Sequence, residues 1–177
     1  MPILNFYTAL KNENIKGVKV NDNVDFANLT SAFIGGTGDF VNLFEPNATK
    51  LEKMGFGYVV ASIGEYSSEV PYTAFNAKKS FIENNQDLIK RFRNSINKGL
   101  EYTLNNESNT IAKTIIDLFP DTSLSDLEQI IERYKKADSW LTTSTISEEL
   151  FTNLEDMLID GNLIKEYVPF NDLIIND

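Results

Sequence analysis

The chain has 177 residues, of which 42% are hydrophobic and 24% are charged, a composition typical of one globular domain with a real core. Its formal net charge of −10 repels phosphate backbones and anionic membrane surfaces, which argues against nucleic acid as a partner. The sequence has no cysteine and no histidine, which removes thiolate nucleophiles and nearly all zinc chemistry and weighs against an enzyme.

The first third of the chain alternates helical and strand-like segments. In residues 3–11 and 25–34, apolar side chains recur three and four positions apart, which predicts two helices. Residues 39–44 and 58–63 are short apolar runs suited to buried strands, and residues 47–54 between them predict a third helix. Because helices between short apolar strands imply parallel pairing with crossovers, this region predicts an α/β layer.

Beyond residue 63 the pattern changes to mainly helical. Residues 64–71 are polar and predict a crossover between two packing units, and residues 72–75 predict a third strand. A capping box, Ser125-x-x-Glu128, indicates a helix N-terminus. Apolar spacing predicts four further helices, over residues 86–104, 111–119, 125–137 and 147–160.

Neither end of the chain nor its interior predicts a membrane segment. There is no apolar run of about 18 residues, the length that a spanning helix needs. The N-terminus, Met1 to Asn5, has no basic region followed by a long apolar stretch, so we expect no signal peptide in this chain.

Two stretches have the composition of ligand-binding loops but fail the tests for them. The glycines of residues 35–38 follow a predicted helix and precede a strand, whereas a phosphate loop follows a strand and opens a helix. Residues 21–25 carry oxygen ligands at calcium-loop spacing, but Phe26 and Ala32 stand where a calcium loop needs glycine and glutamate. We therefore predict turns here and no metal site.

Glu45 and Ser62 both lie where a predicted strand ends, which is the edge at which open α/β sheets bind ligands. Glu45 has two interpretations: it stabilises the following helix N-terminus, or it faces a ligand. Ser62 lies in a sequence similar to a nucleophile elbow, but without histidine to activate it we expect at most a ligand contact.

The order of these segments resembles that of the NMT1/THI5-like family of solute-binding proteins, of the nitrate/sulfonate/taurine or thiamine-precursor type. The resemblance lies in residues 33–46, 57–62 and 70–75, and continues through residues 82–89 and 168–173. It implies a type II periplasmic-binding-protein-like fold, in which two α/β lobes enclose a ligand cleft. The fold is expected to be incomplete here, because the strands of the N-terminal lobe are missing.

The resemblance also implies a division of the chain. Residues 1–65 correspond to the second α/β lobe, residues 66–71 to a hinge crossover, and residues 72–177 to the C-terminal, mainly helical part of the first lobe. It implies the solute-binding component of an ABC importer, which captures a small polar or heterocyclic molecule by lobe closure and delivers it to a permease. The full-length form would be extracytoplasmic, as a cell-surface lipoprotein or a periplasmic protein.

We therefore predict a ligand-binding site without catalytic residues, metal or cofactor. A carboxylate in the cleft favours an amine-bearing or aromatic heterocyclic ligand over nitrate. Two alternatives stay open: a pyrimidine-synthase-like enzyme on the same fold, whose chemistry draws on histidine, and an inactive gene remnant. The predicted ligand-binding residues are Glu45, Phe44, Asn42, Ser62 and Tyr72.

Overall fold

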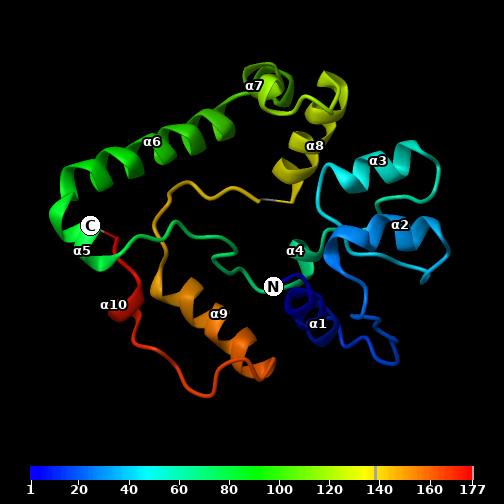
Figure 1. Cartoon of the computed structure of the whole chain (residues 1–177), viewed down its shortest axis with the longest axis horizontal. Helices are drawn as coiled ribbons and strands as arrows, with labels where there is room; N and C mark the ends of the chain where they lie inside the picture. The colour runs from blue at the N-terminus through cyan, green and yellow to red at the C-terminus, as the bar shows by residue number, and fades with distance from the viewer. Residues whose placement is uncertain (138, 177) are drawn as a thin grey trace.

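Helices make up all of the regular secondary structure in residues 1–137 and 139–176, the part of the chain that this computed structural model describes. The seven helices expected from apolar spacing are all present, with ends shifted by at most three residues. The elements are α1 Pro2–Asn12, η1 Phe26–Asn28, α2 Leu29–Ile34, α3 Asn47–Lys53, α4 Ile63–Tyr66, α5 Lys79–Asn84, α6 Gln86–Asn105, α7 Ser108–Ile115, η2 Ile116–Leu118, α8 Leu124–Lys136, α9 Glu148–Asp160 and α10 Phe170–Leu173 (Figure 1).

The three predicted strands are not formed. Residues 39–44, 58–62 and 72–75 lie outside helices and pair with no strand in the described part of the chain. Their apolar side chains are not buried as expected: Phe40 is 81% exposed and Tyr58 is 86% exposed. A strand needs a neighbouring strand to accept and donate its backbone hydrogen bonds, and no described segment supplies one. The predicted incomplete α/β fold is therefore not confirmed by this structure.

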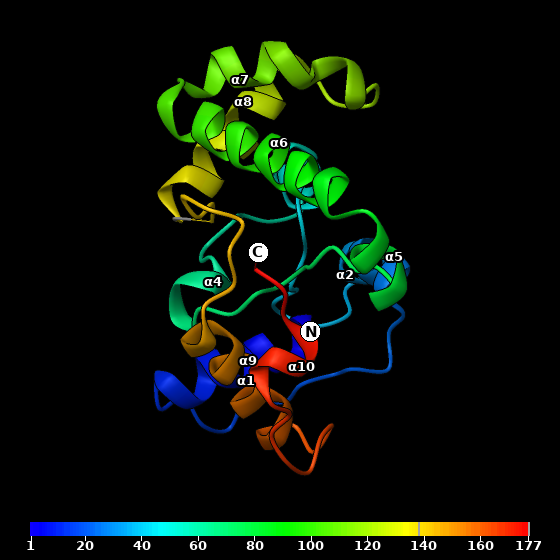
Figure 2. The same ribbon diagram turned by 90° about the vertical axis from the view of Figure 1, so that its left-hand side faces the viewer.

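The main hydrophobic core lies between α7 and α8. Ile111 and Ala112 on α7 are buried against Leu127 and Ile131 on α8. The two helices lie side by side in Figures 1 and 2. Partly buried apolar residues close this core at its edges: Ile115, Ile116, Leu124 and Trp140.

The start of α8 differs from the predicted capping box. Ser123, not Ser125, is the N-cap residue, and its Oγ accepts a hydrogen bond of 3.2 Å from the backbone N–H of Asp126. Glu128 instead accepts a hydrogen bond of 2.8 Å from the Nδ2 of Asn109, at the start of α7.

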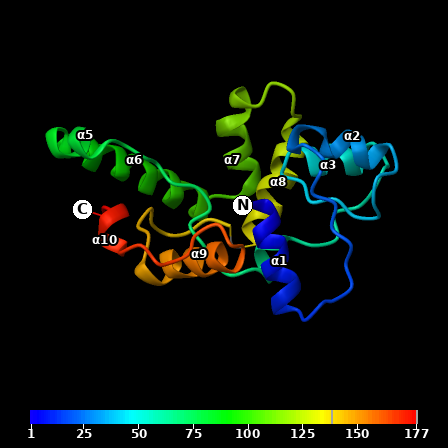
Figure 3. The same cartoon turned by 60° about the horizontal axis from the view of Figure 1, so that its bottom comes forward.

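A second group of helices, formed by α1, α4 and α9, brings together segments that lie far apart in the sequence. α1 packs against α4 and α9 (Figures 2 and 3). Ala9 on α1 and Phe151 on α9 are buried, and the side-chain amide of Asn12 donates a hydrogen bond of 3.0 Å to the carbonyl of Tyr66. Contacts therefore join the predicted second lobe to the predicted first-lobe part.

The molecule exposes a large surface for its mass. Its accessible area is 12591 Å², whereas a compact monomer of 20.0 kDa exposes about 8,700 Å². α6 accounts for part of the difference, because it extends along one edge of the molecule and buries no side chain fully (Figure 1). Leu88 and Phe92 on this helix remain exposed.

Candidate functional site

Arg133 on α8 joins that helix to α3 and the segment that leads into it. Its Nη1 donates hydrogen bonds to the Oε1 of Glu45 at 3.0 Å and to the Oγ1 of Thr49 at 2.9 Å. Its Nη2 forms an ion pair with the Oε2 of Glu52. α8 places Arg133 here because Ile130 and Ile131, on the neighbouring positions of the helix, are buried. We call Glu45, Thr49, Glu52 and Arg133 the Arg133 network.

Both carboxylate oxygens of Glu45 have partners within the protein. Oε1 accepts from Arg133, and Oε2 accepts a hydrogen bond of 2.9 Å from the backbone N–H of Thr49, in the first turn of α3. The Glu45 side chain is only 9% exposed. A carboxylate at this position complements an unpaired N–H at the helix N-terminus. Of the two interpretations of Glu45, the structure shows helix stabilisation directly.

The charges in this network shift two pKa values. Burial raises the pKa of Glu52, but the backbone N–H of Val59 and the Arg133 guanidinium outweigh it, so the pKa of Glu52 lies below its ordinary value. Burial, together with the neighbouring carboxylate of Glu45, raises the pKa of the Tyr134 hydroxyl. The Arg133 network therefore favours the ionised form of Glu52 and the neutral form of Tyr134.

Three aromatic rings follow one another across the surface beside Glu45. The ring centroids of Phe26 and Phe44 are 5.5 Å apart, and those of Phe44 and Tyr72 are 6.0 Å apart with the planes at 89°. All three side chains are exposed. Burial raises the pKa of the Tyr72 hydroxyl, so it stays a neutral donor at physiological pH. We call Phe26, Phe44 and Tyr72 the aromatic row.

The structure brings together the side chains of two of the five predicted ligand-binding residues. Phe44 and Tyr72 are in contact, and Glu45 follows Phe44 in the chain but its side chain binds the Arg133 network instead. Asn42 is half-buried two positions before Phe44. Ser62 is the half-buried N-cap residue of α4. Within residues 1–137 and 139–176, no hydrogen bond or ring contact joins Asn42 or Ser62 to the aromatic row.

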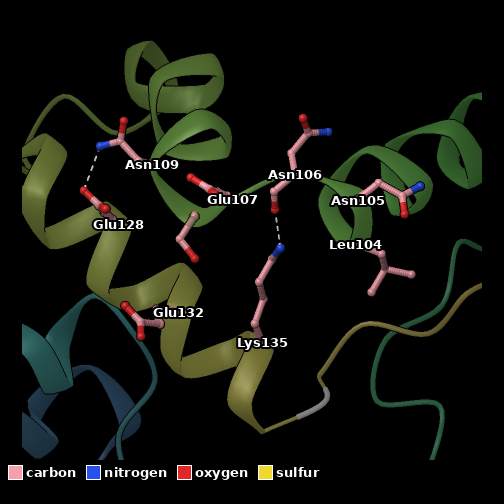
Figure 4. A pocket seen from close by; sticks show the side chains of 9 residues that line it. Leu104, Asn105, Asn106, Glu107, Asn109, Glu128, Glu132 and Lys135 are labelled. Carbon is pink, nitrogen blue, oxygen red and sulfur yellow. Dashed lines mark hydrogen bonds between the residues drawn. The ribbon is translucent and has the colours of Figure 1, made fainter.

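Two surface pockets lie elsewhere. A pocket of about 490 Å³ lies between the end of α6, the start of α7 and α8 (Figure 4). In it, Lys135 donates a hydrogen bond to the carbonyl of Asn106, and Asn109 donates to Glu128, so several polar groups are already paired. A pocket of about 310 Å³ lies between α9 and the segment before α10. Neither contains a predicted ligand-binding residue.

Sequence reasoning missed Arg133 as part of this site. Its position gives a weak signal: a cation next to Tyr134 on the flank of the apolar face of α8. Phe26 was assigned to the apolar face of a helix, and only the fold of residues 35–44 brings Phe44 against its ring. Partners 88 positions apart, such as Glu45 and Arg133, leave no local pattern that would identify them.

The described residues were also compared with the requirements of a metal site and of a membrane-spanning helix. In them, no three histidine, cysteine, aspartate or glutamate side chains gather in a group suited to a metal ion. No helix in that same part of the chain has the length and the apolar character that crossing a bilayer requires.

A family model described as NMT1/THI5 like matches residues 4–110, which is more than half of the chain. The chain belongs to the NMT1/THI5-like family. The matched range contains all three residues of the aromatic row and Glu45, whereas Arg133 lies beyond it. Membership of this family implies a periplasmic-binding-protein-like fold, although the structure of this chain has helices only in its described part.

A relative in Bacillus subtilis (strain 168) carries the name "Putative binding protein YtlA". It is 38% identical to this chain over 159 residues, which cover 90% of the chain and 48% of the relative. The chain thus spans about half the length of the curated relative that it matches. No solved structure matches the chain significantly. The family and this relative together support a solute-binding role.

Proposed function

We propose that this chain is part of the solute-binding component of an ABC importer, and that it binds a small heterocyclic or polar molecule without converting it. The single observation that carries the proposal is the aromatic row, in which the exposed ring of Phe44 contacts those of Phe26 and Tyr72 within the segment that matches the family. Exposed aromatic rings present a large apolar area at low entropic cost, and ligand sites are rich in them.

The chemistry of the row favours a planar ring as the ligand. Offset or edge-to-face contacts with an aromatic ring contribute about 0.5–1.5 kcal/mol beyond the area buried. The Tyr72 hydroxyl supplies a neutral hydrogen-bond group at one end of the row. The carboxylate of Glu45, the residue after Phe44, is already hydrogen-bonded to Arg133 and to the backbone of Thr49, so an amine on the ligand is less important than the sequence alone suggested.

The binding mechanism would be closure of two lobes on the ligand, with binding energy selecting the closed state. In the proposal, the complete binding protein is extracytoplasmic and delivers its ligand to a membrane permease. The aromatic row would form one wall of the cleft, and the remaining half of a protein as long as its relative would supply the other.

A thermal-shift and calorimetric screen of the chain tests this proposal. The probes are nicotinamide, thiamine, taurine and nitrate, which differ in ring and charge. A ligand at a hundred times its Kd adds about 2.7 kcal/mol of stability, a clear rise in Tm. We expect the ring compounds to raise Tm, and Phe44→Ala and Tyr72→Ala to remove the rise.

Phe40→Ala is the matched control, because Phe40 is an exposed phenylalanine of the same segment that makes no contact with the row. It should keep the ligand-induced shift. Equal shifts in the row variants and the wild type, or a shift with taurine and nitrate alone, would contradict the proposed site. A melt without cooperativity would instead support an inactive remnant.

A further inference from the structure

Building on the proposed function, we propose that Arg133 is a positioning residue that sets the charge selectivity of the aromatic row. It holds the Glu45 carboxylate away from the row, so that the row accepts an uncharged planar ring in preference to a cationic one. Arg133 does not touch the ligand in this proposal. It acts through Glu45 and through the backbone that connects Glu45 to Phe44.

The Glu45 carboxylate already accepts hydrogen bonds from within the protein. An ionised carboxylate accepts hydrogen bonds on both oxygens, and here Arg133 occupies one and the Thr49 backbone N–H occupies the other. Charge-assisted bonds of this kind are about twice as strong as neutral ones. The positive charge of Arg133 therefore offsets the negative charge of Glu45, and the hydrogen bonds hold the carboxylate toward α3 and α8.

Phe44 is held in position by its own ring contacts and by the hydrogen bonds of the next residue, Glu45. Its neighbour Glu45 is held between α3 and α8, while the Phe44 ring contacts Phe26 and Tyr72 on the other side. Glu52 adds a second connection, because its Oε1 accepts a hydrogen bond of 3.1 Å from the backbone N–H of Val59 while its Oε2 pairs with Arg133. Arg133 thus orders the polypeptide on both sides of α3.

Arg133 also offsets negative charge near the aromatic row. Exposed aromatic rings attract cations by themselves, and a free carboxylate next to them strengthens that attraction. Arg133 cancels one of the two negative charges of Glu45 and Glu52 and is only 25% exposed, so the solvent screens it incompletely. Removing Arg133 leaves the carboxylate of Glu45, the residue next to Phe44, without its cationic partner, which makes the row better suited to cations.

The test compares two planar probes of nearly the same shape: nicotinamide, which is uncharged, and 1-methylnicotinamide, a permanent cation. Calorimetry gives the ratio of their affinities for the wild-type chain, Arg133→Gln, Arg133→Lys and Lys136→Gln. Lys136 is the matched control, because it is an exposed cation of the same helix whose ion pair in the described part of the chain is with Glu132. Each Gln variant removes one positive charge.

We expect the wild type to bind nicotinamide at least about tenfold more tightly than the cation, and Arg133→Gln to reduce or reverse that ratio by about tenfold. Arg133→Lys should restore part of the ratio, and Lys136→Gln should leave it unchanged. The double variant Arg133→Gln/Glu45→Gln should lose the gain in cation binding, because the released carboxylate is gone.

Hydrogen exchange supplies a readout that needs no ligand. The backbone amides of Thr49 and Val59, which bind Glu45 and Glu52, should exchange faster in Arg133→Gln and as in the wild type in Lys136→Gln. Unchanged exchange and an unchanged affinity ratio in Arg133→Gln would overturn the proposal. Failure of the wild type to bind either probe would overturn ring binding itself, while the exchange rates would still decide whether Arg133 orders this segment.

Discussion

Arg133 Nη1 lies 3.0 Å from Glu45 Oε1, although 88 positions separate the two residues in the chain. This ion pair joins α8, which belongs to the α7–α8 core, to the segment that carries Phe44 and matches the binding-protein family. It links the main hydrophobic core to the region where we propose that a ligand binds.

Arg133→Leu should lower the free energy of unfolding by about 2–4 kcal/mol. The substitution leaves Glu45, whose side chain is 9% exposed, without its cationic partner, and unpaired buried charges are costly. The value falls toward the lower end because Arg133 itself keeps some exposure to solvent. Urea denaturation measures the change, and Lys136→Ala, at an exposed ion pair, should change stability by less than about 1 kcal/mol.

The Glu52 carboxylate should make stability depend on pH in the acid range. Its folded-state pKa lies below the ordinary value of 4.5, so the ion pair stabilises the folded state above that pH and the contribution is lost as pH falls through the folded-state pKa. Urea midpoints should therefore fall on acidification. Glu52→Gln should be less stable than the wild type at neutral pH, and the gap should close in acid. A constant gap across the pH range would contradict this assignment.

Ile131→Ala should destabilise the α7–α8 core by about 2–5 kcal/mol, because it removes buried methyl groups and leaves a cavity against Ile111 and Leu127. Leu118→Ala is the control at an exposed apolar residue and should stay within about 0.5 kcal/mol. Both are measured by chemical denaturation. Equal losses in the two variants would mean that the core does not lie where the structure places it.

Ser123→Ala should cost about 1 kcal/mol of stability, because it removes the side-chain acceptor at the N-terminus of α8. Ser125→Ala tests the capping box that the sequence suggested, and it should be close to neutral because Ser125 lies inside the helix with its side chain exposed. Thermal melts of the two variants decide between the two caps. A larger loss in Ser125→Ala would favour the sequence-based cap.

The helices could be predicted from the sequence because their signal is local. The apolar spacing of residues 125–137 correctly predicted a helix, α8, in which Leu127, Ile130 and Ile131 are buried and Tyr134 is half-buried. The strands could not be predicted in the same way. A strand is stable only when it pairs with another strand, and the local sequence does not identify that partner. Residues 39–44 and 58–62 have strand-like composition but no strand beside them in the described residues.

For the predicted ligand-binding site too, the sequence determined some features and the tertiary structure determined others. The order of apolar and polar segments, read from the sequence by itself, led to the NMT1/THI5-like family, which the family model confirms. The sequence also selected Glu45, Phe44, Asn42, Ser62 and Tyr72 as one candidate group. Only the tertiary structure decided how that group is arranged: Phe44 contacts Tyr72 and Phe26, while Glu45 is paired with Arg133. The physical reason is that periodicity determines which face of an element is apolar, whereas the partner of a charge depends on which distant elements pack together.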